Sequence, residues 1–357
     1  MPTVTPLLAL AHHPVVLALV APGGGGLEVG LLGEVEVGHH GLQPLLLLLQ
    51  LQLQLGDDLH LYARLRSALV IQHVLGADVL DEGRKILHDI TSASWKVARE
   101  HKVSGFIAET PTWRASSLWA AKLGISDEEL VILIKTGVSD LLQFREKSVT
   151  QDDYIPFVIA GAVGPKGDGF VVNEPLTPKE SKNYHKLEIA AMAEAGVDLV
   201  VAATMTHVGE ALGIILAAKE SNVPVIIGFT VETDGKLPDG TTLKEAIVKT
   251  DEMSSSYAVS FMVNCAHPSH FSPLFKSPPR EDWMKRIRAI RANPSAKSHA
   301  ELDESPTLDA GDPVEFGRLC GQMKKCLPEL NVFGGCCGTN EKHLDQVAVT
   351  LKTLYDF

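Results

Sequence analysis

The sequence predicts an α/β fold, a TIM-type (β/α)8 barrel, and three observations support this. From about residue 80 to the C-terminus, apolar segments of strand length alternate with segments of helical character. The apolar segments are nearly continuous, as in a parallel sheet that helices cover on both faces. Seven such segments in roughly 280 residues suit a closed barrel. A doubly wound sheet is the alternative, but the chain has no strand–GxGxxG–helix unit and no GxxxxGK[ST] motif.

The predicted elements follow one another along the chain as strand and helix. The strand at 286–293 is the weakest, because three arginines interrupt its apolar pattern. One strand of the barrel, the first, is missing from this series, so it must come from the N-terminal region or be absent. Strands are expected at 104–110, 154–164, 197–204, 223–230, 257–265, 286–293 and 330–335, and helices at 126–146, 178–195, 208–219, 243–250, 313–325 and 343–354.

The N-terminal region, residues 1–79, has a different composition from the rest. Lys, Asn, Phe, Trp and Cys are absent before Lys85, and residues 45–55 read LLLLLQLQLQL. The alternation of Gln and Leu is compatible with a strand, but low-complexity bias is the simpler interpretation. We therefore divide the chain into an atypical region at 1–79, divergent or disordered, and a barrel domain at 80–357.

Charge and composition exclude several classes of protein. The net charge is −12 and the pI about 5.6, which disfavours binding to a nucleic acid or to an anionic membrane surface. The N-terminal apolar run has no basic residue ahead of it and is interrupted by His and Pro, so it resembles neither a signal peptide nor a membrane helix. We expect a cytoplasmic protein that acts on small molecules. The sequence does not predict its oligomeric state.

Three cysteines at strand ends carry the main functional prediction. Cys265 ends one predicted strand, and Cys336 and Cys337 follow another. The C-terminal ends of parallel barrel strands open on one face, so these thiols are expected to meet there. Zinc favours thiolate ligands, and a catalytic zinc keeps three protein ligands and one open position. Isolated cysteines more often fill a core, and this is the expectation for Cys320 and Cys326 in a predicted helix.

The adjacent cysteines need a bend in the chain. Neighbouring residues of a regular strand point to opposite faces. Gly334, Gly335 and Gly338 flank the pair, and glycine permits a bend that turns both sulfurs inward.

At this point the sequence resembles the homocysteine S-methyltransferase family. GGCCGT, VNCAHP and AGAVGP match that family, and three further segments resemble a subgroup of it. The resemblance implies a TIM barrel, a zinc ion held by Cys265, Cys336 and Cys337, and a homocysteine thiolate at the fourth position. The matching segments lie at 334–339, 263–268, 160–165, 106–116, 228–240 and 291–304.

Three further residues are predicted to bind substrate. Glu109 and Thr110 end a predicted strand and are expected to face the same end of the barrel as the three cysteines. Glu109 carries a carboxylate that suits a substrate ammonium. Asn264 precedes the first cysteine and is expected to orient its neighbour or the substrate, while His267 is a candidate for a supporting contact. A structural hydrogen bond is the alternative for Asn264 and His267, and an ordinary helix-start or salt-bridge role is the alternative for Glu109.

The chain departs from the family pattern in two places. The DGG-type first strand of the family is not found, and Ala203 stands where many members carry the Glu of a Glu-Thr pair. The resemblance implies methyl transfer to homocysteine, giving methionine. S-methylmethionine or S-adenosylmethionine is the expected donor, because the chain has no room for folate and cobalamin modules. The alternatives are a barrel that binds zinc or a thiol without turnover, and another thiol or selenol as acceptor.

Overall fold

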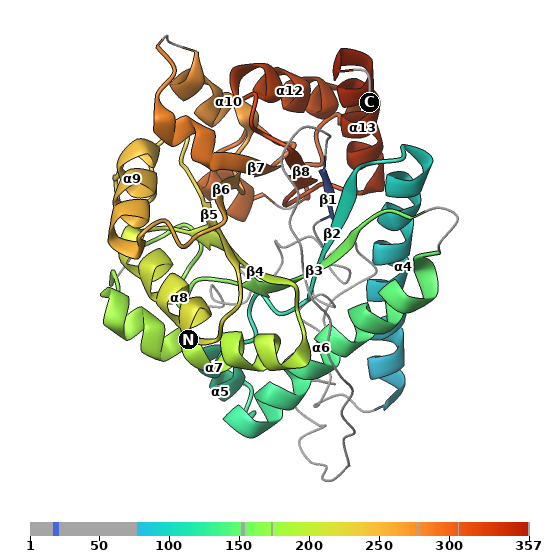
Figure 1. Cartoon of the computed structure of the whole chain (residues 1–357), viewed down its shortest axis with the longest axis vertical. Helices are drawn as coiled ribbons and strands as arrows, with labels where there is room; N and C mark the ends of the chain where they lie inside the picture. Colours follow the sequence, from blue (N-terminus) through green and yellow to red (C-terminus); the bar gives the residue numbers. More distant parts are fainter. Residues whose placement is uncertain are drawn as a thin grey trace.

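A closed barrel of eight strands, in chain order, forms the centre of the described structure. The computed structural model describes residues 17–20, 77–150, 154–172, 174–276, 279–305 and 307–355. Helices lie outside the ring of strands (Figure 1). The strands are β1 (Leu17–Val20), β2 (Gly105–Glu109), β3 (Phe157–Val163), β4 (Leu199–Met205), β5 (Val225–Phe229), β6 (Ser260–Asn264), β7 (Ile287–Ala292) and β8 (Val332–Gly335).

The first strand is the divergent part of the barrel, as predicted. Strands β2 to β8 pair in parallel, each with the next. Strand β1 comes from the N-terminal region and pairs antiparallel with both β2 and β8. A regular (β/α)8 barrel has eight parallel strands, so closure here depends on a short strand of opposite direction.

The seven predicted strands coincide with β2 to β8, and the six predicted helices are present with ends shifted by a few residues. The helices are α6 (Asp127–Ser148), α7 (Pro178–Ala195), α8 (Val208–Glu220), α9 (Leu243–Ser254), α12 (Pro313–Cys326) and α13 (Glu341–Tyr355). Shorter helices not predicted are α5 (Ser117–Lys122), α10 (Pro268–Phe271), η2 (Ser272–Phe275), η3 (Asp282–Arg286) and α11 (His299–Asp303).

A long helix that the sequence analysis did not predict, α4 (Ala77–Glu100), precedes β2. Its Trp95 packs edge-on against Phe106 of β2, with 5.2 Å between ring centroids. The helix begins close to the predicted boundary at residue 79/80. Residues 1–16 and 21–76 lie outside the described part of the chain, so the division into two regions stays a prediction.

Capping boxes fix where four of the helices begin. In each, a Ser or Thr accepts a hydrogen bond from the backbone N–H three residues on, and a Glu at that position bonds back. The exchange satisfies two N–H groups that a helix start otherwise leaves unpaired. The pairs are Ser126 with Glu129, Thr177 with Glu180, Thr242 with Glu245 and Ser298 with Glu301.

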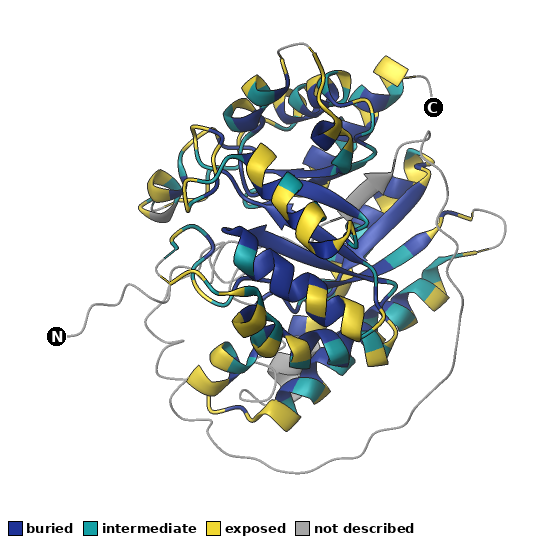
Figure 2. Ribbon diagram, turned by 60° about the vertical axis from the view of Figure 1, so that its left-hand side comes forward, coloured by how far each residue is buried: buried dark blue, intermediate teal, exposed yellow. Residues whose placement is uncertain are grey.

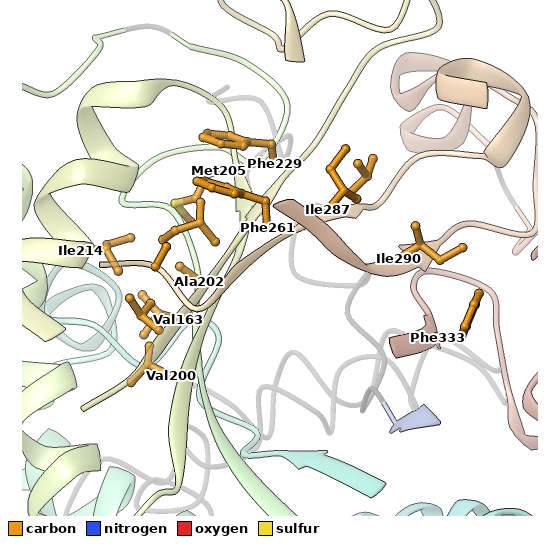
Figure 3. Packing of buried hydrophobic residues seen from close by; sticks show 14 of the residues in the cluster. Val163, Val200, Ala202, Met205, Ile214, Phe229, Phe261, Ile287, Ile290 and Phe333 are labelled. Carbon is orange, nitrogen blue, oxygen red and sulfur yellow. The ribbon is translucent and has the colours of Figure 1, made fainter. Parts of the chain in front are cut away.

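The strands bury both faces. In β4, Val200 and Ala202 pack outward against the helices, whereas Val201 and Ala203 belong to a smaller cluster inside the barrel. Figure 3 shows Ile214 of α8 beside the outward-facing residues. Exposed residues lie mainly on the outer surfaces of helices and in loops (Figure 2). Because all strands except β1 run in parallel, their C-terminal ends share one mouth.

Among the described residues, no helix is both long and apolar enough to cross a lipid bilayer.

Candidate metal centre

Three thiols from two strand ends converge at the mouth of the barrel. The sulfur atoms of Cys265, Cys336 and Cys337 all lie within 4.8 Å of one another, and the Sγ atoms of Cys265 and Cys337 are 3.7 Å apart. Tetrahedral zinc with Zn–S bonds of about 2.3 Å places its sulfur ligands about 3.8 Å apart. The spacing and the donor chemistry therefore fit a zinc ion bound by three cysteines.

Strand β7 brings the cysteines together, because it lies between the strands that carry them. The backbone N–H of Cys265 donates to the carbonyl of Arg291, and that of Cys336 donates to the carbonyl of Ala292. Neighbouring residues of one strand thus anchor both thiol-bearing turns.

The turn after β8 depends on glycine, as the sequence predicted. A Cβ atom at Gly335 would lie 2.1 Å from Oγ1 of Thr339, and that hydroxyl donates to the Cys336 carbonyl. Gly338 has φ of +86°, a conformation that is strained for other residues. Cys265 itself has φ of +56°. Left-handed backbone at a non-glycine residue is strained and persists only when surrounding contacts hold it.

The Cys265 carbonyl makes two of the contacts that hold this conformation. It accepts hydrogen bonds from Nδ2 of Asn293 at 3.1 Å and from Nε2 of His299 at 2.5 Å. The other ring nitrogen of His299 bonds to Glu232 at 2.9 Å. Burial lowers the pKa of His299, but the Glu232 carboxylate and the Cys265 carbonyl outweigh it and raise the pKa overall. His299 also stacks on Phe170 from the loop after β3, with 4.0 Å between centroids.

The electrostatics of the thiol cluster favour a cation at its centre. Burial raises the pKa of Cys265, and the neighbouring thiols raise the pKa of Cys337. Three thiols so close together, two of them on buried residues, cannot all ionise without positive charge to offset the repulsion. A bound divalent cation removes that obstacle, because it replaces the thiol protons.

A buried ion pair adjoins the thiols, and the sequence analysis predicted only half of it. Nη1 of Arg291 donates to both carboxylate oxygens of Glu109, at 3.0 and 2.8 Å. Arg291 is 1% exposed. Burial lowers its pKa, but Glu109 and the neighbouring Cys336 and Cys265 raise it overall. Burial raises the pKa of Glu109, and Arg291 opposes that shift. The inward position of Arg291 on β7 was the signal available in the sequence.

The other two predicted substrate residues are engaged with internal partners. Nδ2 of Asn264 donates to Oγ1 of Thr204, and Oδ1 of Asn264 accepts from the Thr204 N–H, both at 2.9 Å. Thr110 bonds to Thr112 through the two hydroxyls at 2.6 Å and accepts from the Ala162 N–H at 3.0 Å. These contacts order the strand ends around the mouth. A direct contact with substrate stays a prediction for Glu109, Thr110 and Asn264.

His267 and Ala203 are placed near this region in supporting positions. His267 is the N-cap of α10, where Nδ1 accepts from the Ser269 N–H at 3.2 Å. Ala203 is buried, and its carbonyl accepts a hydrogen bond from Nε1 of Trp113 at 3.1 Å. Trp113 therefore packs against the end of β4 where the sequence lacks the carboxylate.

The remaining cysteines do not join the cluster. Cys320 is buried in α12, where burial raises its pKa to about 12, and Cys326 ends the same helix. All five cysteines lie in the described part of the chain, and none forms a disulfide. The core role predicted for Cys320 fits this placement.

Comparison with known proteins identifies the family. The family model for homocysteine S-methyltransferase matches residues 98–351, most of the chain. The chain belongs to the homocysteine S-methyltransferase family. The match includes the three clustered cysteines and all seven parallel strands.

Relatives in this family are distant. Homocysteine S-methyltransferase 1 of Arabidopsis thaliana is 23% identical over 263 residues, which cover 69% of this chain and 78% of that protein. Homocysteine S-methyltransferase 2 of the same plant is 25% identical over 288 residues, covering 75% and 78%. Homocysteine S-methyltransferase YbgG of Bacillus subtilis is 22% identical over 259 residues, covering 69% and 79%.

A solved structure shares the fold. The metallated form of the homocysteine methyltransferase MmuM from Escherichia coli aligns with a TM-score of 0.60 at 15% identity, over 85% of this chain and 93% of that one. At this identity the likeness shows the barrel fold.

Proposed function

We propose that the chain is a zinc-dependent methyltransferase that transfers a methyl group from a sulfonium donor to homocysteine and gives methionine. The convergence of the three sulfurs within 4.8 Å carries the proposal, and membership of the homocysteine S-methyltransferase family supports it. Cys265, Cys336 and Cys337 would hold the zinc ion. Bound zinc supplies a Lewis acid that keeps a substrate thiol in its nucleophilic thiolate form.

The residues around the thiols hold the cluster in place. Asn293 and His299 fix the carbonyl of Cys265, and Thr339 fixes that of Cys336. Fixed ligands and a buried site favour an ordered, water-poor mouth in which the reacting sulfur is positioned. Glu109 remains our candidate for binding the substrate ammonium, which requires that it share its carboxylate between the substrate and Arg291.

The methyl-transfer step needs no general base, because the attacking sulfur is already a thiolate. A lone pair of the thiolate sulfur forms a bond to the methyl carbon, and the bond from that carbon to the donor sulfonium breaks with its electrons going to the departing sulfur. The negative thiolate and the positive sulfonium become two neutral thioethers. S-methylmethionine and S-adenosylmethionine both provide such a leaving group, and the two are distinguished by assay.

The experiment is a methyl-transfer assay on the purified full-length chain. Homocysteine is supplied with each donor, and methionine is quantified by mass spectrometry. We expect methionine with at least one donor, and loss of activity and of zinc in Cys336→Ser. The matched control is Cys326→Ser, which changes a half-buried thiol outside the cluster and should keep both.

Three results would contradict parts of this proposal. A Cys336→Ser variant that keeps full activity removes the role of the cluster. A wild-type protein that binds zinc and produces no methionine with either donor is a zinc-binding relative without this activity. Faster turnover of a selenol or another thiol in competition with homocysteine changes the acceptor.

A further inference from the structure

We infer that Arg291 is a positioning residue that sets the charge of the metal site, so that the site holds an anionic thiolate in preference to a neutral thioether. The inference rests on the proposed function and deepens it. It concerns which form of sulfur the open position selects.

The placement of Arg291 is the first support. The guanidinium is fully buried inside the barrel on β7, next to the two turns that carry the thiols. The thiols of Cys336 and Cys265 lie close enough to the guanidinium to raise the pKa of Arg291. Arginine keeps its positive charge in proteins, so a permanent cation lies against the sulfur cluster.

The hydrogen bonds of the guanidinium are the second support. Nη1 is used by the Glu109 carboxylate. Nε is buried and has no hydrogen-bond acceptor among the described residues. A buried N–H without an acceptor costs free energy. A thiolate brought to the cluster would supply an acceptor and a negative charge near this group.

The net charge of the zinc complex explains why a cation beside it would be stabilising. Three thiolates and one divalent zinc carry one net negative charge, and a substrate thiolate raises this to two. Such charge is costly in a buried site unless it is offset. A methionine thioether adds no charge. Arg291 therefore stabilises the thiol complex more than the thioether complex, which favours binding of substrate over product.

Glu109 limits the effect. Its carboxylate binds Nη1 and neutralises part of the guanidinium charge, and the ion pair joins β7 to β2. Removal of Arg291 alone leaves this carboxylate buried without its partner, which is destabilising. The test therefore includes a variant in which both partners are neutral.

The test measures three binding constants at fixed pH and ionic strength. Zinc affinity of the reduced apoprotein is measured by competition with a chelator. Affinities of the zinc-loaded protein for L-homocysteine and for L-methionine are measured by calorimetry. The variants are Arg291→Lys, Arg291→Gln, Glu109→Gln and the double variant Glu109→Gln/Arg291→Gln. The double variant serves as the test protein if Arg291→Gln does not fold.

Arg286 offers a matched control. It lies five residues before Arg291, at the end of η3 just ahead of β7, and forms an ion pair with Asp251 at 2.6 Å. Arg286→Gln removes a paired arginine remote from the sulfurs. Any loss shared by Arg286→Gln and Arg291→Gln reflects stability rather than the charge of the site.

We expect Arg291→Gln and the double variant to bind zinc about tenfold or more weakly, and to lose homocysteine affinity by a larger factor than methionine affinity. Arg291→Lys should retain most of both, and Glu109→Gln should bind zinc at least as tightly as wild type. Two results would overturn this inference and leave the proposed function standing. One is an equal loss of affinity for homocysteine and for methionine, and the other is unchanged zinc affinity in both Arg291→Gln and the double variant. A wild-type chain that takes up no zinc would overturn the proposed function as well.

Discussion

Asn264 and Thr204 are joined by two hydrogen bonds of 2.9 Å, one to the backbone N–H of Thr204 and one to its hydroxyl. Thr204 has φ of +67°, so the asparagine, at the end of β6, stabilises a strained end of β4 across the intervening strand β5. The residue after Asn264 is the ligand Cys265. The contact therefore connects the backbone of one strand end to the metal centre.

Asn264→Ala should lower the free energy of unfolding by about 2–4 kcal/mol, because it leaves two buried groups of Thr204 without a partner. Urea denaturation of the wild type and the variant measures this difference. Asn331→Ala, at the start of β8, is a control for loss of an asparagine outside the mouth and should change stability little. A variant as stable as wild type would show that the pair does not hold the strand end.

His299→Ala should weaken zinc binding about tenfold, because the Cys265 carbonyl loses one of its two side-chain donors and its left-handed backbone is less well held. Chelator competition measures the affinity. His270 and His299 both line a small pocket beside Cys265, but His270 bonds to the Ala296 carbonyl, so His270→Ala is the matched control. Equal zinc affinity in wild type and His299→Ala would contradict the positioning role.

The buried cluster around His185 should make stability depend on pH above neutrality. His185 bonds to Glu188 and to Glu210, with His207 and Tyr184 also facing the cluster. Burial lowers the pKa of His185, but the two carboxylates outweigh it and raise the pKa to about 9.

A folded-state pKa above the unfolded value stabilises the protein below the unfolded pKa, and the contribution is lost as pH rises through the folded pKa. The stability difference between wild type and His185→Asn should therefore be largest near pH 6 and shrink between pH 7 and pH 10. Denaturation across this range tests it, with exposed His88→Asn as the control. A difference that stays constant over the range would rule out a protonated His185.

Strand β1 should be needed for a soluble barrel. It covers the edges of β2 and β8, and an exposed strand edge pairs readily with another chain. We expect a chain that begins at residue 77 to aggregate or to unfold at lower temperature than the full-length protein, as measured by light scattering during heating. A truncated chain as stable and as monodisperse as the full-length protein would show that β1 does not close the barrel.

The sequence predicted the parts of the site that depend on strand ends. Apolar segments of strand length predict β6 and β8. The residues that directly follow these two strands are Cys265, Cys336 and Cys337. Because the C-terminal ends of parallel barrel strands share one face, the three thiols could be predicted to lie close together. The glycines around the Cys336–Cys337 pair predicted the bend that the backbone shows.

Other features depend on contacts between distant residues, which a single sequence does not reveal. Three arginines weakened the prediction of β7, yet Arg286 pairs with Asp251 outside the barrel mouth and Arg291 pairs with Glu109 across the interior. The inward strand position of Arg291 is a local signal, but neither arginine's partner can be read from the sequence. The direction of β1 was likewise unpredictable, because an isolated apolar run does not specify its partner strands.

Zinc content tests the central claim most directly. The full-length protein is purified under reducing conditions, and zinc per chain is measured by elemental analysis beside Cys336→Ser and Cys326→Ser. The account predicts about one zinc per chain in wild type and Cys326→Ser, and a large loss in Cys336→Ser. Folded wild-type protein without zinc, or full zinc content in Cys336→Ser, would contradict a metal centre made by the three cysteines.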